Sequence, residues 1–74
     1  MDEEYIMVTA MGIHYDDGGS VVIFEGIEDE TGDVIRFGVD QRHAYALYQA
    51  CANGESPVVA VPEWSLIRRI PASA

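Results

Sequence analysis

Apolar residues in the first half of the chain recur in short runs that are separated by polar turns. Residues 5–15 and 20–27 are rich in β-branched, aromatic and methionine side chains, which are enriched in strands. Residues 34–39 show the cleanest pattern, because apolar positions alternate there with a period of two. This alternation predicts a strand that turns Ile35 toward the core and Arg36 toward solvent.

Two polar segments that contain glycine separate these three runs. Residues 16–19 read Asp-Asp-Gly-Gly, a strong turn signal, because aspartate tolerates the left-handed backbone region and glycine enters it freely. Residues 28–33 are polar, acidic and also contain a glycine. We therefore expect two hairpin loops that join three antiparallel strands into a meander. Gly12 indicates a bulge or bend in the first strand.

The character of the chain changes at Asp40, after which residues 41–53 are rich in helix-compatible types such as alanine, leucine and glutamine. Asp40 is suited to cap the start of a helix, since its carboxylate can accept from free backbone N–H groups. Asn53 and Gly54 are a stop signal. One face of this helix carries, at helical spacing, Ala44, Leu47, Tyr48 and Cys51.

Two further strands are expected after the helix. Residues 58–61 are β-branched or small and lie between Pro57 and Pro62, which is typical of a short edge strand. The apolar residues of segment 63–70 predict a fifth strand. Residues 71–74 are expected to form a flexible tail.

The element order β-β-β-α-β-β predicts a single small α+β domain over residues 1–70. Its sheet is either a strongly bent antiparallel sheet with the helix across one face, or a small five-stranded barrel with the helix between the third and fourth strands. The latter is the element order of oligonucleotide-binding barrels, but order alone implies no function. We expect Phe24, Phe37 and Trp64 in the core, and an exposed Tyr45.

Charge narrows the range of partners. The chain has 13 acidic residues against 4 arginines and no lysine, so its formal net charge is −9. Nucleic acids and anionic membranes attract cationic proteins, so both are unfavourable partners. Basic protein surfaces would be attracted instead, although such a charge also serves solubility. The acidic start is unlike a signal peptide, and the lone Cys51 suits a reducing compartment, so we expect a cytoplasmic protein.

Carboxylates gather in the two expected loops: Asp16, Asp17, Glu28, Asp29, Glu30 and Asp33. Such groups can hold a hard cation such as calcium. Neither loop has the spacing of a calcium-binding loop, and the two loops fall at opposite ends of a meander. We therefore expect an acidic surface of solvated turns and no metal site.

Candidate catalytic side chains are few. His14, His43 and Cys51 are short of the four ligands of a structural zinc site. Eight residues of helix, roughly 12 Å, separate His43 from Cys51, which is too far for a nucleophile–base pair. No nucleophile-elbow, phosphate-loop or dinucleotide motif is present. We therefore expect neither an enzyme nor a cofactor.

These exclusions favour a non-enzymatic binding or regulatory protein that acts through protein–protein contacts. Arg42 and Tyr45 are the candidate interface residues, because arginine and tyrosine are enriched in binding hot spots. A homodimer through edge strands is also open. One alternative is an acidic inhibitor, of the phage or mobile-element accessory type, that imitates nucleic acid and blocks a DNA-binding protein. The other is single-stranded nucleic-acid binding on a barrel face, which the net charge disfavours.

The excess of carboxylates predicts that moderate salt stabilises the fold. Raising NaCl from ~10 mM to ~0.15 M shortens the range of charge repulsion, so the melting temperature measured by circular dichroism should rise. An unchanged or lower value would show that the acidic groups are already paired or too dispersed to repel one another.

Overall fold

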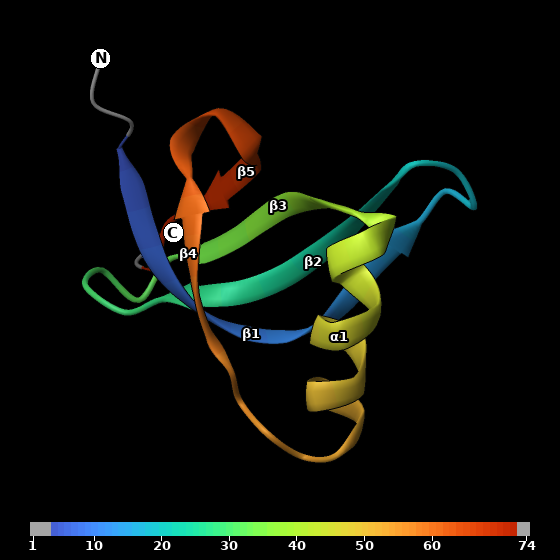
Figure 1. Ribbon diagram of the computed structural model, residues 1–74. Helices are drawn as coiled ribbons and strands as arrows, with labels where there is room; N and C mark the ends of the chain where they lie inside the picture. Colours follow the sequence, from blue (N-terminus) through green and yellow to red (C-terminus); the bar gives the residue numbers. More distant parts are fainter. Residues whose placement is uncertain (1–3, 73–74) are drawn as a thin grey trace.

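In the computed structural model, which describes residues 4–72, five antiparallel strands form one sheet in the order β4-β1-β2-β3-β5 (Figure 1). A single helix lies between β3 and β4. The elements are β1 Tyr5–Asp16, β2 Val21–Glu28, β3 Val34–Asp40, α1 Gln41–Ala52, β4 Val58–Pro62, a 3₁₀ turn Glu63–Ser65 and β5 Leu66–Ile70. The predicted α+β class and element order are therefore confirmed. Of the two shapes considered, the bent sheet is correct, because the sheet is not closed into a barrel.

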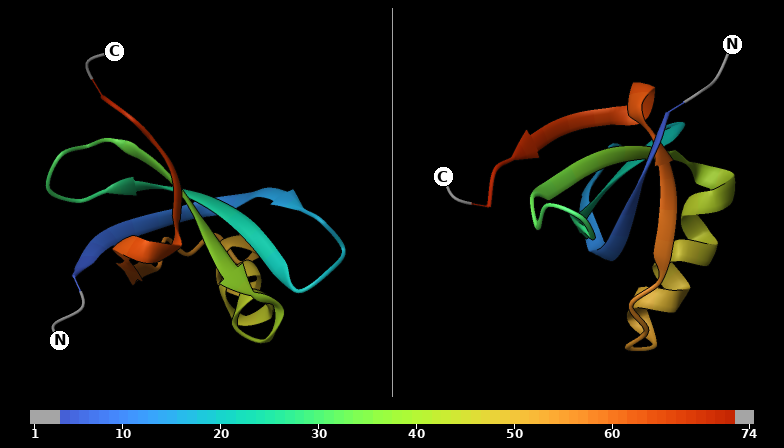
Figure 2. Two further views of the ribbon diagram at one scale, coloured as in Figure 1. Left: turned by 90° about the horizontal axis from the view of Figure 1, so that it is seen from above. Right: turned by 90° about the vertical axis from the view of Figure 1, so that its left-hand side faces the viewer.

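Bulges bend the long strand β1. Its register against β2 shifts between Ala10 and Gly12, and again between Ile13 and Tyr15. Each extra residue kinks the strand and increases its twist, so the bend expected at Gly12 is confirmed. Figure 2 shows the result: the sheet curls, and its two end strands come near each other at the 3₁₀ turn that joins them.

Gly26 lies where β1 and β2 approach each other closely. A Cβ atom built at this position would lie 2.5 Å from the backbone oxygen of Thr9 and 2.6 Å from Cγ1 of Val8. Both distances are far below van der Waals contact, so this crossing requires a residue without a side chain.

The core fills the concave side of the sheet. Its largest fully buried side chains are Phe24, Phe37, Ile35 and Val8. The Phe24 and Phe37 rings stack with centroids 6.2 Å apart and an interplanar angle of 22°. The inward orientation predicted for Ile35 and the core positions predicted for Phe24 and Phe37 are confirmed.

Trp64 is not in the core, so that prediction was wrong. Its side chain is 76% exposed. The expectation treated residues 63–70 as one continuous strand, but residues 63–65 form a 3₁₀ turn, which the Ser65 hydroxyl closes by donating to the Pro62 carbonyl at 2.9 Å. The turn interrupts the alternation of faces, and Leu66 packs against the core instead.

Helix α1 begins and ends as predicted. The Asp40 carboxylate accepts from the His43 backbone N–H at 3.0 Å, Asn53 is the C-cap, and Gly54 adopts a φ of +82°. Ala44 is the helix's buried residue, while Leu47 is half-buried. The helix is therefore attached to the sheet through one narrow stripe. The flexible tail expected at 71–74 reaches beyond the described residues, which end at 72.

Gly26→Ala should destabilise the fold by about 1–3 kcal/mol, because the added methyl group meets backbone atoms that cannot move aside cheaply. Gly12→Ala is the matched control, since a Cβ atom there meets nothing within 4 Å. Urea unfolding should show a lower midpoint for Gly26→Ala and an unchanged or slightly higher midpoint for Gly12→Ala. Equal midpoints for the two variants would contradict the close crossing of β1 and β2.

Candidate functional site

The two ends of the open sheet leave a gap that we call the open seam. Strand β5 pairs with β3 from Val34 as far as Phe37, where the register ends against Leu66. Beyond that point, residues 38–40 of β3 pair with β2 alone. Strand β4 pairs with β1, and no described strand pairs with its other edge. The open seam lies between this free edge of β4 and residues 38–40.

An apolar groove occupies the open seam, and we call it the seam groove. It has a volume of about 770 Å³, and its walls come from β3, α1, β4 and the 3₁₀ turn. Its apolar lining includes Ala46, Leu47, Ala50, Val59, Val61 and Trp64. The groove exists because α1 and β4 are both attached to the sheet but not packed against each other along their length.

Three large apolar side chains at the seam groove remain in water, and the least exposed of them, Val21, is 40% exposed. Trp64 is 76% exposed and Ile67 is 59% exposed. Exposed apolar residues are ordinary when they are scattered, but a contiguous apolar patch commonly marks an interaction site. The sequence pattern did not indicate the exposed position of Trp64, because strand alternation predicts that it lies in the core.

The charged groups at the seam groove are acidic. Asp40 lines it, and hydrogen bonds from the backbone N–H and ring of His43 lower the pKa of Asp40 below its usual value. Glu63 is exposed beside Trp64, and its backbone N–H donates to the Glu4 carbonyl at 2.9 Å. None of the four arginines lines the groove. Asp40 is therefore the carboxylate that lines the apolar groove, and Glu63 is a second exposed carboxylate next to the lining residue Trp64 in the chain.

The two interface residues expected from the sequence lie elsewhere. Tyr45 is 69% exposed, as expected, and lines a second hollow of about 500 Å³ on another side of α1, together with Tyr48 and Ile13. Arg42 is exposed and lines neither hollow. The structure therefore does not bring these two residues together with the seam groove.

The carboxylates of the two hairpin loops lie at opposite ends of the sheet (Figure 1). Asp16 and Asp17 accept from the backbone N–H groups of Gly18 and Gly19 at 2.8 and 2.7 Å, which shapes the first turn. In the second loop, Asp29 accepts from the Thr9 hydroxyl at 2.8 Å. Glu30 is exposed. These residues do not converge on one surface.

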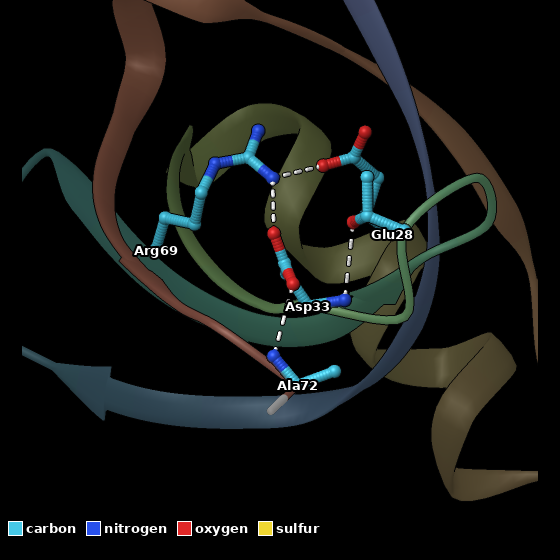
Figure 3. A network of polar contacts seen from close by, with 5 residues as sticks. Glu28, Asp33, Arg69 and Ala72 are labelled. Atoms are coloured by element: carbon cyan, nitrogen blue, oxygen red, sulfur yellow. Dashed lines mark hydrogen bonds and ion pairs between the residues drawn. The ribbon is translucent and has the colours of Figure 1, made fainter. Parts of the chain in front are cut away.

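Glu28 and Asp33 form an ion-pair network with Arg69, which Figure 3 shows. Arg69 Nη1 donates to Glu28 Oε1 and, at 2.8 Å, to Asp33 Oδ2. Asp33 Oδ1 also accepts from the Ala72 N–H at 3.0 Å. The hydrogen bond from Arg69 is the main reason that the pKa of Asp33 lies below its usual value.

Glu28 does not belong to the acidic surface that the sequence predicts, because it is only 5% exposed. Glu28 continues the buried face of β2, which also carries Val22, Phe24 and Gly26. A period of two over these positions could have identified Glu28 as an inward residue. The same contacts attach β5 to the turn between β2 and β3.

Other candidate chemistry is sparse between residues 4 and 72. In this part of the chain no three His, Cys, Asp or Glu side chains are grouped so that they could hold a metal ion. His14 Nδ1 lies 3.8 Å from Glu25 Oε2, while Cys51 is half-buried on α1. Glu25 also accepts from Arg36 Nε at 3.1 Å. His14 lies on β1, Glu25 on β2 and Arg36 on β3, so these contacts join side chains of neighbouring strands.

Comparisons of the chain with protein-family models, with curated proteins and with solved structures found no match. Within the described range, α1 is too short and too polar to cross a membrane.

Asp33→Asn should lower the melting temperature near neutral pH, because it weakens the contact with Arg69. The folded-state pKa of Asp33 lies below 3.8, so its contribution is present above that pH and is lost as pH falls through the folded-state value. Thermal melts between about pH 6 and pH 2 should therefore show the wild-type and variant curves converging at the acid end.

Glu30→Gln is the matched control, because Glu30 makes no hydrogen bond or ion pair with residues 4–72. Its melting temperature should not fall relative to the wild type near neutral pH. A constant difference between wild type and Asp33→Asn at every pH would contradict the role of the Asp33 carboxylate.

Proposed function

We propose that this protein is a small non-enzymatic binding protein that acts by contacting another protein, and that the seam groove is its contact surface. The observation that carries the proposal is Trp64, which is 76% exposed at the edge of an apolar groove. Transferring a large apolar side chain from water to a protein contact gains about 1.5–3 kcal/mol. Tryptophan is also enriched among the residues that dominate binding energy.

Non-enzymatic action is favoured by the polar groups of the seam groove. Asp40 and His43 are hydrogen-bonded there, and Ser65 also lines it. A Ser-His-Asp mechanism would need the hydroxyl to donate to the imidazole. The Ser65 hydroxyl donates instead to the Pro62 carbonyl at 2.9 Å. Its role is therefore to hold the 3₁₀ turn that presents Trp64.

A protein partner is favoured over a nucleic acid because of the charge around the seam groove. Asp40 and Glu63 are exposed there, and the chain as a whole carries a net charge of −9. Phosphate groups would be repelled, whereas a basic protein surface would be steered toward the groove. Action as a nucleic-acid mimic receives less support, because the loop carboxylates are divided between two ends of the sheet and two of them are paired with Arg69.

A cytoplasmic location is part of this proposal. The thiol of Cys51 is free, and reducing compartments keep thiols in that state.

Site-specific photocrosslinking tests the proposed surface. Trp64 is replaced by a photoreactive phenylalanine analogue, and irradiation in extract of the source organism should yield one discrete protein adduct. Tyr15, which is 55% exposed and lines neither hollow, is replaced in the same way as the control. Excess wild-type protein should suppress the adduct, and excess Trp64→Ala protein should not. Identical adducts at both positions, or none at position 64, would contradict the proposal.

A further inference from the structure

The free edge of β4 offers backbone groups to a partner. In an antiparallel pair, residues alternate between those whose N–H and C=O groups face the neighbour and those whose groups face away. The Ala10 N–H donates to the Pro57 carbonyl at 2.9 Å, and the Glu63 N–H donates to the Glu4 carbonyl at 2.9 Å. Both bonds put the odd-numbered residues of this segment on the β1 side.

The even-numbered residues of β4 therefore direct their backbone groups to the open seam. Val58 and Ala60 each present one N–H and one C=O there. They stand opposite Thr9 and Met7 in the register with β1, at positions whose backbone groups face away from β1. Pro62 has no N–H, and its carbonyl already accepts from the Ser65 hydroxyl. Among residues 4–72, the segment from Val58 to Ala60 thus has an edge that no other strand pairs with, and this edge lies beside the apolar groove.

The other end of the sheet is protected by charge and a register shift, which β4 lacks. Strand edges are usually guarded by charged side chains, bulges, prolines or a short strand length. Strand β5 carries Arg68 and Arg69 and has a register shift against β3. The sequence of β4, in contrast, is Val-Val-Ala-Val-Pro and has no charge. Pro62 protects one end of this edge, because it has no N–H, but the backbone groups of Val58 and Ala60 still face the open seam.

We infer that the partner contributes an extended, basic segment that adds to β4 as a further strand of the sheet; this inference rests on the proposed function. Backbone bonds to Val58 and Ala60 fix the segment, as in other cases of strand addition. Alternate side chains of an added strand point to opposite faces, so one set enters the seam groove against Leu47 and Val59. The other set is free to carry lysine or arginine.

Charge selects this occupant over a second copy of the chain. Asp40 lines the groove and is acidic, as is the exposed Glu63 beside Trp64 in the chain, and two copies would each bring a net charge of −9 to the contact. Like charges repel at the separations from which proteins approach, whereas a basic segment is attracted.

Trp64 provides the readout, because it is the chain's single tryptophan and lines the seam groove. The probe is a synthetic peptide of alternating valine and lysine. Titration should shift Trp64 fluorescence to shorter wavelength, and nuclear magnetic resonance should show the largest shifts at the amides of Val58 and Ala60. The same peptide with N-methyl groups on its pairing edge should bind about tenfold more weakly, because it lacks those backbone donors.

Two variants of α1 form a matched pair for the position of the peptide. Ala46 lines the seam groove, while Ala52 lies on the same helix outside both hollows, and both are exposed. Ala46→Arg should abolish the fluorescence shift, because the arginine side chain would fill the groove and repel the lysine residues of the peptide. Ala52→Arg should keep the shift. A peptide of alternating valine and glutamate should cause no shift with the wild-type protein.

The outcomes separate this inference from the proposed function. Equal binding of the methylated and unmethylated peptides would overturn strand addition, while the crosslink at position 64 would still stand. Absence of any shift, or equal loss in both arginine variants, would overturn the basic-strand occupant. Sedimentation that shows a dimer abolished by Ala60→Pro would also overturn it, in favour of a second copy. Loss of the crosslink alone would instead contradict the proposed function.

Discussion

The close crossing of β1 and β2 at Gly26 is the constraint on which the rest of the structure depends. With no side chain at this position, the backbone of β1 can lie against β2, and the bulges that follow Ala10 then turn β1 away. The first half of β1 carries β4, and its second half continues along β2. One bent strand thus lets five strands curl around a few buried side chains. A flat sheet of this length would leave the same apolar residues in water.

The curl is secured at one end and open at the other. Arg69 attaches β5 to Glu28 and Asp33, so this end strand is held through side chains as well as through its ladder with β3. Glu28 is nearly buried, and a buried carboxylate without a positive partner is strongly destabilising. This explains why an arginine occupies position 69. Strand β4 has no such contact with β3, and α1 is attached through Ala44 alone among its buried residues. The seam groove is the consequence of this asymmetry.

The sequence predicted those features that local patterning controls. Alternation in residues 34–39, the loop signals and the caps at Asp40 and Gly54 each depend on neighbouring residues, and each agrees with the structure. Closure of the sheet, in contrast, depends on contacts between distant segments, which periodicity does not report. The same limit explains the error at Trp64, where the 3₁₀ turn after Pro62 restarted the alternation. For the same reason, residue type alone points to Arg42 and Tyr45 as interface residues, while the groove beside β4 depends on tertiary contacts that the sequence pattern does not report.

The net charge and the open edge are best understood together. An uncharged strand edge next to an apolar groove would ordinarily favour association between copies of the same chain. A charge of −9 on a chain of 74 residues opposes that association, because every copy repels every other. The repulsion acts over a Debye length of about 8 Å at physiological ionic strength, which covers the approach of two small domains. The same field would attract a basic segment, so under the proposed function the charge that opposes self-pairing also favours such a partner. Under this proposal, the acidic charge offsets the exposure of the β4 edge, and the two features together would favour a foreign strand over a second copy.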